Sequence, residues 1–475
     1  MSFRISRKTC LIAQNIGSFA ISSINFINDL ALQNRMLVES FSGIRGIYGL
    51  DLTSDVAGRY AFAYYNYLSQ KIGRGPIIVV GRDTRPSGSA VYKAVIESVT
   101  NVLDVGIIPI PALSLAVREF KADGGIMITA SHNEPEFNGL KFLSSDGAVL
   151  VPNEMQTVIN SFRKVKDVPA RKPSIKIKDI SSVYSKFIGN LTGTIENNYK
   201  VIADANGGTG YLLEKVAKDL GVKNIRVINQ EQGIFKRKVE PTKESLAYLR
   251  DMIKADGAVF AAGFDCDADR VEILLDDGTI VDGNMLLAII VDHMVGNKKG
   301  VVVVNDATSN IIRDICAKHG CLLKEVEVGE INVVSEMARL DSPIGGEGSN
   351  GGIIIPPSKG RDGIISFLML LKILNDEHKT LKQKISEFPK YHTLQRKIAA
   401  KGYSKDKVKR HYKGFGFKET GDETGGLKVI LDEKSFVWFR VSKTEPDTLR
   451  IISESESEEK SQEMMSQAIT ALQKE

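Results

Sequence analysis

The chain has 475 residues and a mass of 52.1 kDa, which is too long for one hydrophobic core and predicts about three or four domains. Hydrophobic residues make up 43% and charged residues 25% of the sequence, which excludes a fibrous or disordered chain. With 63 Lys and Arg against 58 Asp and Glu, the net charge is +5, too small for the dense basic surface of a nucleic-acid-binding protein.

Apolar runs are short and cysteines are few. The longest apolar run is MLLAIIV at 285–291, well short of the ~18 residues that a membrane span needs, so we expect no membrane partner. Cys10, Cys266, Cys316 and Cys321 are too few and too scattered for a disulfide scaffold. This cysteine usage fits a reducing cytosol, and we predict a cytoplasmic protein.

Residues 1–35 differ in composition from the rest of the chain. They are rich in Ser, Asn and Ile, with four basic residues and only one acidic residue. A transit peptide has this composition, and so does a stretch upstream of the true start codon. Met36 opens a regular segment and no small-residue cleavage site is evident, so we favour the start-codon interpretation and exclude residues 1–35 from the fold.

Alternating helix and strand patterns begin near residue 53. An N-cap sequence at 53–55 and apolar residues at helical spacing predict a helix that ends at Gly73. Three apolar runs, at 76–83, 200–208 and 300–308, each predict a buried strand followed by a polar turn and a helical stretch. We therefore predict three related α/β domains with mixed or parallel sheets.

The last ~85 residues differ again, and this shift predicts a domain boundary. The basic stretch at 396–410 predicts a solvated helix face, and the acidic run at 454–459 predicts a solvent-facing segment. Between them, three β-rich runs predict antiparallel strands, and a polar helix ends the chain. We predict a C-terminal α+β domain after the three α/β domains. The proposed boundaries are 36–185, 186–295, 296–390 and 391–475.

The serine loop, residues 125–142, places Ser131 and His132 after an apolar strand, with Lys141 further along. A Ser beside a His suggests a hydrolase with a serine nucleophile. However, adjacent side chains rarely face each other, and no G-x-S-x-G elbow surrounds this serine. The alternative is a serine that caps a helix or turn.

The carboxylate loop, residues 261–270, places Asp265, Asp267 and Asp269 at alternate positions after a small-residue strand. Three carboxylates so close repel each other, and a divalent cation with oxygen ligands, Mg²⁺ or Ca²⁺, would offset this repulsion. An EF-hand is excluded because its loop needs Gly at position 6 and Glu at position 12. A surface acidic turn is the alternative, and the apolar flanking residues argue against it.

Two further loops carry polar groups. The glycine-rich loop, residues 342–356, presents Glu347, Ser349 and Asn350, which could accept hydrogen bonds from sugar hydroxyls, although this pattern alone is weak. The clamp, within residues 440–454, gathers cationic and hydroxyl donors that suit a phosphate, and a solvated hairpin tip is an equal alternative. The clamp residues are Arg440, Ser442, Lys443, Thr444 and Arg450.

The four loops together resemble those of one enzyme superfamily. TASHN, the DxDxDR cluster, the GGE loop and the R-x-S-x-T-E-P turn occur in the order and spacing of the α-D-phosphohexomutases. This superfamily includes phosphoglucomutases, phosphomannomutases and phosphoglucosamine mutases. The resemblance runs from about residue 38 to the C-terminus, and SGIRG at 42–46 and GRDTRPSG at 81–88 agree with it.

The resemblance implies a heart-shaped, four-domain enzyme with its site where the domains meet. Ser131 would carry a phosphoryl group, and its phosphate and the three aspartates of the carboxylate loop would coordinate one Mg²⁺. Glu347, Ser349 and Asn350 would contact the sugar, and the clamp would hold the phosphate that is not transferred. The groups implied around the phosphoserine, with Lys141 or a neighbour moving the hydroxyl proton, are Arg45, His132, Lys141 and Arg270.

The implied reaction is the Mg²⁺-dependent interconversion of a hexose 1-phosphate and a hexose 6-phosphate through a bisphosphorylated sugar. Glucose or mannose is the expected sugar, and a phosphoglucosamine mutase is the alternative. A metal-dependent sugar phosphatase and a non-enzymatic phosphosugar sensor are more remote rivals. We expect a phosphosugar as the ligand and a monomer or homodimer as the assembly.

The sequence departs from the superfamily at several positions. Cys266 and Ala268 replace the usual glycines of the carboxylate loop, so a backbone that needs a positive φ there would be strained. Gly351 replaces a frequent His, Lys443 replaces a Gly or Asn of the clamp, and Glu327 stands where many relatives carry a phosphate-binding Lys. These departures leave the identity of the sugar open.

Overall fold

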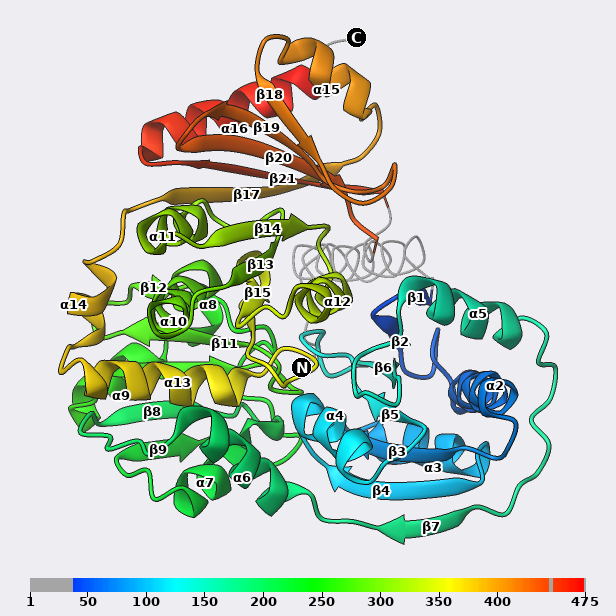
Figure 1. Ribbon diagram of the computed structural model, residues 1–475. Helices are drawn as coiled ribbons and strands as arrows, with labels where there is room; N and C mark the ends of the chain where they lie inside the picture. Colours follow the sequence, from blue (N-terminus) through cyan, green and yellow to red (C-terminus); the bar gives the residue numbers. More distant parts are fainter. Residues whose placement is uncertain (1–36, 444–446, 474–475) are drawn as a thin grey trace, which may run out of the picture.

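Four β-sheets follow one another along the chain and lie around a common centre in Figure 1. The computed structural model describes residues 37–443 and 447–473. The predicted extension at 1–35 lies outside these residues. Three sheets are mixed and flanked by helices, and the last sheet is antiparallel, so the predicted fold class is confirmed.

The first sheet holds the serine loop. Its elements are β1 (Val38–Ser40), β2 (Gly43–Ile47), α2 (Ser54–Ile72), β3 (Ile77–Arg82), α3 (Gly88–Glu97), β4 (Asn101–Ile107), α4 (Ile110–Glu119), β5 (Gly124–Ile128), β6 (Phe137–Leu143), α5 (Pro152–Phe162) and β7 (Ser174–Ile177). The strand order is β1-β2-β6-β5-β3-β4-β7, with parallel pairing among β5, β3, β4 and β7. Helix α2 is capped by Thr53 and ends at Gly73 in a left-handed conformation, as predicted.

The second sheet holds the carboxylate loop. Its elements are α6 (Ser181–Thr192), β8 (Val201–Asp204), η1 (Thr209–Tyr211), α7 (Leu212–Asp219), β9 (Ile225–Ile228), α8 (Lys243–Leu246), α9 (Leu249–Asp256), β10 (Phe260–Phe264), β11 (Val271–Leu275) and β12 (Ile280–Val281). The order is β12-β11-β10-β8-β9, and β10, β8 and β9 are parallel. The parallel strands end on one edge, where the loop after β10 lies.

The third sheet holds the glycine-rich loop. Its elements are α10 (Gly283–Asn297), β13 (Val301–Asn305), α11 (Ile311–His319), β14 (Leu322–Val326), α12 (Glu330–Leu340), β15 (Gly345–Glu347), η2 (Gly348–Asn350), β16 (Gly352–Ile354), α13 (Gly363–Asp376) and α14 (Leu381–Ile385). The order is β14-β13-β15-β16, with β13 parallel to both neighbours. The apolar runs predicted as strands at 76–83, 200–208 and 300–308 are β3, β8 and β13.

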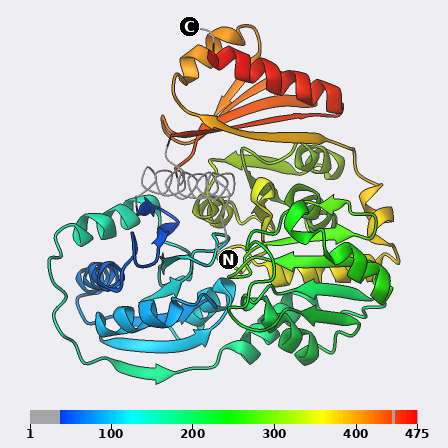
Figure 2. The same cartoon turned by 180° about the vertical axis from the view of Figure 1, so that it is seen from behind.

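The fourth sheet is antiparallel and lies over the third sheet in Figures 1 and 2. Its elements are β17 (His392–Ala399), α15 (Lys405–His411), β18 (Gly416–Glu419), β19 (Leu427–Asp432), β20 (Ser435–Val441), β21 (Thr448–Ser455) and α16 (Glu458–Gln473). The order is β17-β21-β20-β19-β18.

Two predictions for this region are only partly right. The first residues of the stretch at 396–410 are the end of β17 and pair with β21, whereas its last residues form helix α15. The start of the run at 454–459 is buried, since the Glu454 carboxylate accepts a hydrogen bond from the Asn310 backbone N–H at 2.7 Å. This carboxylate therefore ties the fourth sheet to α11.

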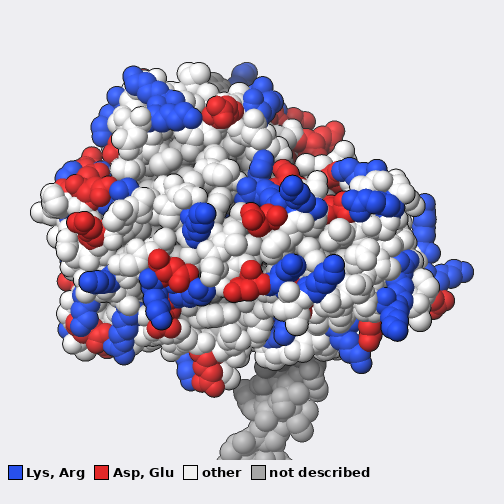
Figure 3. Space-filling model, turned by 60° about the horizontal axis from the view of Figure 1, so that its bottom comes forward, with Lys and Arg blue, Asp and Glu red and all other residues white. Residues whose placement is uncertain are grey.

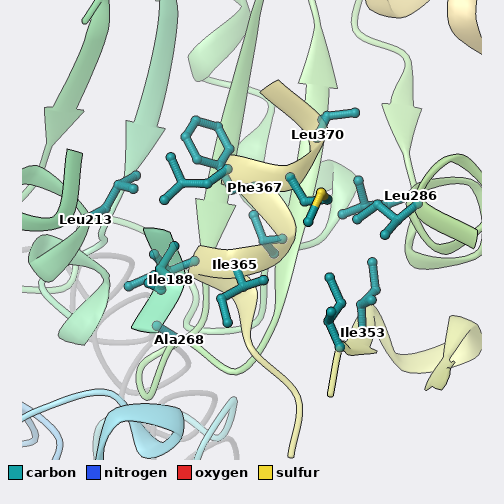
Figure 4. Packing of buried hydrophobic residues seen from close by; sticks show 14 of the residues in the cluster. Ile188, Leu213, Ala268, Leu286, Ile353, Ile365, Phe367 and Leu370 are labelled. Carbon is teal, nitrogen blue, oxygen red and sulfur yellow. The ribbon is translucent and has the colours of Figure 1, made fainter. Parts of the chain in front are cut away.

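One hydrophobic core joins the three α/β sheets. Helix α13 lies in its middle, and Figure 4 shows Phe367 and Ile365 on this helix between Ile188 on one side and Leu286 on the other. All four side chains are fully or almost fully buried. The three α/β sheets therefore pack around one continuous core. The predicted domain boundaries stay predictions.

The surface carries charges of both signs. On the face shown in Figure 3, Lys and Arg side chains are interspersed with Asp and Glu side chains. Among the helices in the described part of the chain, none combines the length and the apolar character that crossing a membrane requires.

Candidate active site

The four loops singled out from the sequence converge on one cavity of about 1360 Å³. Every sheet contributes to its wall. The predicted site residues that line the cavity are Arg45, His132, Lys141, Arg270, Glu347, Ser349, Arg440, Ser442, Lys443 and Arg450. Ser131 and the three aspartates of the carboxylate loop are buried beside it. Thr444 lies outside the described residues.

Ser131 is held in a left-handed backbone conformation directly after β5, with φ of 52°. Its backbone N–H donates to the Thr129 hydroxyl at 2.8 Å, and its own hydroxyl donates to Asp265 Oδ2 at 3.0 Å. The serine therefore faces the carboxylates and not His132. Nδ1 of His132 has no hydrogen-bond partner among the described residues, and the Ser131 hydroxyl is bonded to Asp265, so the two residues are not paired as in a serine hydrolase.

Asp265, Asp267 and Asp269 follow β10 and converge as a possible cation site. Each offers a carboxylate oxygen within 4.8 Å of the others, and all three are buried. Lys141 Nζ lies 2.8 Å from Asp267 Oδ2 and 3.5 Å from Asp269 Oδ2. Oδ1 of Asp267 and Oδ1 of Asp269 are buried without a hydrogen-bond partner in the described part of the chain. Unpartnered buried carboxylate oxygens fit a hard divalent cation.

Electrostatics in the carboxylate loop point the same way. Burial, followed by the charges of Asp269 and Asp267, raises the pKa of the Asp265 carboxyl well above its usual range. The two neighbouring carboxylates make ionised Asp265 unfavourable. A bound cation would remove this penalty, because it would offset the repulsion among the three groups.

The backbone of the carboxylate loop is strained at one of the two positions that depart from glycine. Ala268 has φ of 52°, in the left-handed region that favours glycine, whereas Cys266 has no positive φ. The carbonyl of Ala268 accepts from the Gly363 N–H at 3.1 Å, and Cys266 lies against Gly208. The start of α13 therefore fixes the loop in this conformation.

Cationic side chains surround the serine. Burial, followed by the charge of Arg270, lowers the pKa of Arg45 to about 10. Burial also lowers the pKa of His132 well below its usual range, with Arg270 and Arg45 contributing, so the imidazole is neutral. Arg270 Nε lies 3.7 Å from Asp269 Oδ1. This concentration of positive charge suits an anion such as phosphate above Ser131.

Arg361 is a site residue that sequence reasoning missed. Its guanidinium joins Asp269 at 2.6 Å to Glu347 at 3.0 Å, and its backbone N–H donates to Glu330 at 2.7 Å. It therefore connects the carboxylate loop to the glycine-rich loop. The following residue, Asp362, caps α13. A charged pair before an apolar helix was visible in the sequence, but the partners of Arg361 were not.

Arg85, within the GRDTRPSG segment at 81–88, donates hydrogen bonds to the backbone of the serine loop. It is buried, its Nε lies 3.0 Å from Asp83, and it donates to the carbonyls of Ser131 at 2.7 Å and Phe137 at 3.0 Å. Buried carbonyls need such donors. Arg85 therefore positions the loop backbone and does not line the cavity.

Glu347 ends β15 and is buried at the cavity wall. Oε1 accepts from the Gly329 N–H at 2.8 Å and the Asn305 amide at 3.1 Å, and Oε2 accepts from Arg361. Ser349 lies 3.3 Å from the Asn305 amide. The backbone of Asn350 completes η2. Hydrogen bonds from groups outside the glycine-rich loop thus hold Glu347 and Ser349 at the cavity.

Gly351 is accounted for by its surroundings. Its φ is 66°, and a Cβ built on it would lie 2.7 Å from Glu272 Oε1. The Glu272 side chain occupies the space that a larger residue at position 351 would need. A histidine at this position would therefore clash unless Glu272 moved.

Four of the five clamp residues, Arg440, Ser442, Lys443 and Arg450, line the cavity. Arg440 on β20 and Arg450 on β21 are directly opposite in the strand register. The Arg440 side chain is 9% exposed, and its guanidinium lies 2.9 Å from Glu327 Oε1. Lys443 Nζ lies 2.7 Å from the same oxygen. Two of the clamp cations, Arg440 and Lys443, thus converge on one anionic atom.

Family models and related sequences both match this chain to the same protein family. Three domain models, described as phosphoglucomutase/phosphomannomutase α/β/α domains I, II and III, match residues 39–168, 182–278 and 282–391. A phosphoglucomutase/phosphomannomutase of Thermococcus kodakarensis is 33% identical over 449 residues, covering 91% of this chain and 97% of that protein.

Two further relatives extend this result. A phosphoglucosamine mutase of Carboxydothermus hydrogenoformans is 30% identical, covering 91% of this chain and 98% of that protein. The solved structure of a phosphoglucomutase/phosphomannomutase family protein of Burkholderia thailandensis superposes with a TM-score of 0.79 at 22% identity, covering 92% of this chain and 98% of that chain. This superposition supports the same fold.

Proposed function

Since the chain belongs to the phosphoglucomutase/phosphomannomutase family of phosphohexomutases, we propose that it interconverts hexose 1-phosphate and hexose 6-phosphate in a Mg²⁺-dependent reaction. Glucose or mannose is the proposed sugar. Ser131 is the proposed phosphoryl carrier, and a bisphosphorylated sugar is the intermediate.

One observation carries the proposal. The Ser131 hydroxyl lies 3.0 Å from Asp265, which belongs to a buried cluster of three carboxylates, while cationic side chains surround it from the cavity side. A phosphoryl group needs both a cation and Arg or Lys donors, because charge on its equatorial oxygens must be offset during transfer. This arrangement supplies both.

The aspartates of the carboxylate loop, with a phosphate oxygen on Ser131, are the proposed ligands of one Mg²⁺ per chain. When bound, the ion neutralises charge on the transferred group. Arg45 and Arg270 are the proposed donors to the same phosphate. Lys141 is held charged, because Asp267 and Asp269 outweigh the effect of burial and raise its pKa.

Proton transfer fits His132 better than Lys141. Phosphoryl transfer breaks the P–O bond at Ser131 and forms a P–O bond to a sugar hydroxyl. The hydroxyl proton passes to a base, and the Ser131 oxygen that leaves phosphorus takes up a proton to become a hydroxyl again. Neutral His132 lines the cavity and has an Nδ1 without a partner in the described part of the chain. In the reverse half-reaction the same group would return the proton.

The sugar would lie between the glycine-rich loop and the clamp. Glu347, Ser349 and Asn350 are proposed to contact its hydroxyls, and the clamp residues Arg440, Ser442, Lys443, Thr444 and Arg450 to hold the phosphate that is not transferred. A phosphoglucosamine mutase activity is the second candidate, favoured by the 30% identity to the Carboxydothermus enzyme over nearly the whole chain.

Steady-state kinetics test the proposal. We would measure kcat/KM for glucose, mannose and glucosamine 1-phosphates, each with a trace of the matching bisphosphate, and identify the product. A 6-phosphate product supports the mutase, and the preferred sugar identifies the substrate. Release of inorganic phosphate would favour a sugar phosphatase. Binding of the sugar phosphate without turnover would favour a non-enzymatic sensor.

A further inference from the structure

Two carboxylates at the end of β14 reach from the third sheet to the fourth. Glu325 lies 2.6 Å from Lys428 and also contacts Lys418. Glu327 lies 2.9 Å from Arg440 and 2.7 Å from Lys443. Both carboxylates cross between the same two sheets. Only the cations of Glu327 belong to the clamp.

The Glu327 carboxylate is enclosed by the clamp. Its side chain is 13% exposed, and Oε1 forms ion pairs with both Arg440 and Lys443. A Cβ built on Gly421, in the turn before β19, would lie 2.3 Å from Oε2, so the backbone of that turn adjoins the second oxygen. A carboxylate oxygen with two cationic donors has the environment of a phosphate oxygen.

We propose that Glu327 is an internal competitor for the clamp: its carboxylate occupies the place of a phosphate oxygen, and the incoming phosphate must displace it. The inference rests on the proposed function only in naming a phosphosugar as the displacing ligand. The competition itself follows from the shared cations, because Arg440 and Lys443 cannot bind both anions with full strength.

The charges of the competing groups give Glu327 a selective role. A carboxylate carries one negative charge, whereas a phosphate monoester carries about 1.5 to 2 at neutral pH. A phosphate therefore gains enough attraction to displace Glu327, and a monoanion such as acetate does not. The competition also weakens retention of the bound phosphate, which helps a bisphosphorylated sugar leave the clamp and bind again in the opposite orientation.

The test is calorimetric titration with inorganic phosphate, which needs no turnover. Glu327→Gln keeps the shape of the side chain and removes its charge, and we expect phosphate to bind more than about threefold tighter than to the wild-type chain. Glu325→Gln is the matched control, since it also removes a cross-sheet ion pair but leaves the clamp cations untouched. Its phosphate affinity should stay at the wild-type value.

Combining Glu327→Gln with Arg440→Ala assigns any gain to the clamp, because the gain should disappear in the double variant. A gain of less than threefold, an equal gain in Glu325→Gln, or a gain that persists without Arg440 would overturn the proposal. If Glu327→Gln fails to fold, as judged by circular dichroism, Glu327→Ala is titrated under the same criteria.

Turnover measurements separate this inference from the proposed function. If the wild-type chain is a mutase, Glu327→Gln should lower KM for the hexose 1-phosphate without raising kcat, because release of the bisphosphate becomes slower. If the wild-type chain shows no mutase activity but the titration gives the expected gain, the proposed function is wrong and the competition stands. If the wild-type chain is a mutase but Glu327→Gln does not bind phosphate more tightly, the proposed function stands and the competition is wrong.

Discussion

The Ser131 hydroxyl reaches Asp265 because a left-handed backbone conformation turns it toward the carboxylates. Such a conformation costs a non-glycine residue free energy of order 1 kcal/mol or more, so the surroundings must hold it in place. Here Thr129 accepts from the Ser131 backbone N–H, and Arg85 donates to the Ser131 carbonyl. These two hydrogen bonds therefore hold the backbone in the conformation that directs the side chain at position 131 toward the carboxylate cluster.

Replacing Ser131 by Ala should remove nearly all mutase activity and leave the fold intact. The lost hydroxyl makes one hydrogen bond to Asp265, which is worth only about 0.5–1.5 kcal/mol. Product formation and thermal unfolding measure the two effects. Ser131→Gly is the matched control, because glycine accepts the positive φ without strain. Turnover within about tenfold of wild type in either variant would exclude Ser131 as the carrier.

Replacing Asp267 by Asn should weaken Mg²⁺ binding at least about tenfold and lower kcat with it, because a hard ligand oxygen loses its charge. Activity as a function of free Mg²⁺ measures the change. Wild-type activity should vanish in a chelator and return when Mg²⁺ is added. Full activity in the chelator would remove the metal from the proposed mechanism.

Replacing Arg440 by Ala should lower kcat/KM for hexose 1-phosphate and hexose 6-phosphate alike. The lost charge-assisted hydrogen bond is worth about 1.5–3 kcal/mol, or roughly 10- to 150-fold. Arg440→Lys should restore only part of the loss, since an ammonium cannot bind phosphate with the two parallel bonds of a guanidinium. Unchanged kcat/KM for both sugar phosphates in the alanine variant would exclude Arg440 from the phosphate site.

Regular sequence patterns predict the positions of helices and strands, but they do not predict which single charged residues are buried. The N-cap and glycine stop of α2 and the apolar runs of β3, β8 and β13 are local, so the sequence alone predicts them. Only the first part of the stretch at 396–410 differs from its prediction, because a basic strand at a sheet edge and a basic helix have the same composition. Glu454 was predicted as exposed because its partner, the Asn310 N–H, lies far away in the sequence.

Asp362 caps helix α13, and its carboxylate accepts from the Ile365 N–H and from the Tyr184 hydroxyl. Burial raises the pKa of Asp362 to about 7. The folded state therefore holds a proton that the unfolded state, with an ordinary pKa of 3.8, has released. The stability from this group is complete below about pH 4 and is lost as the pH rises through about 7.

Replacing Asp362 by Asn should remove this dependence while keeping the helix cap, since Asn also caps helices. Thermal unfolding of both proteins at about pH 5 and about pH 8 measures the effect. The wild-type Tm should fall more than the variant Tm between the two conditions. An equal fall in both proteins would show that Asp362 does not titrate in this range.

In the whole molecule, the site exists only because the four sheets are assembled around it. Ser131, Asp265, Glu347 and Arg440 come from different sheets, and the core around α13 joins three of these sheets. The sequence predicts which loops carry polar groups. It does not predict that Arg361 joins Asp269 to Glu347, or that Glu327 enters the clamp, because both contacts depend on how the sheets pack.

The residues proposed to contact the sugar are already hydrogen-bonded within the protein. Glu347 and Ser349 are bonded to neighbouring protein groups, and these bonds are compatible with several sugars. Recognition at the second carbon of the sugar depends on contacts that form only with the ligand. Kinetic comparison of the three sugar phosphates is therefore the direct route to the substrate.

The central claim, that Ser131 carries the phosphoryl group, is tested most directly by locating that group on the chain. The protein is incubated with glucose 1,6-bisphosphate and Mg²⁺, digested, and its peptides are mapped by mass spectrometry. Our account predicts one phosphate on the peptide that contains Ser131, and the passage of that phosphate into the sugar product when hexose monophosphate is then added. A phosphate on another residue, or none in an enzyme that turns over, would contradict it.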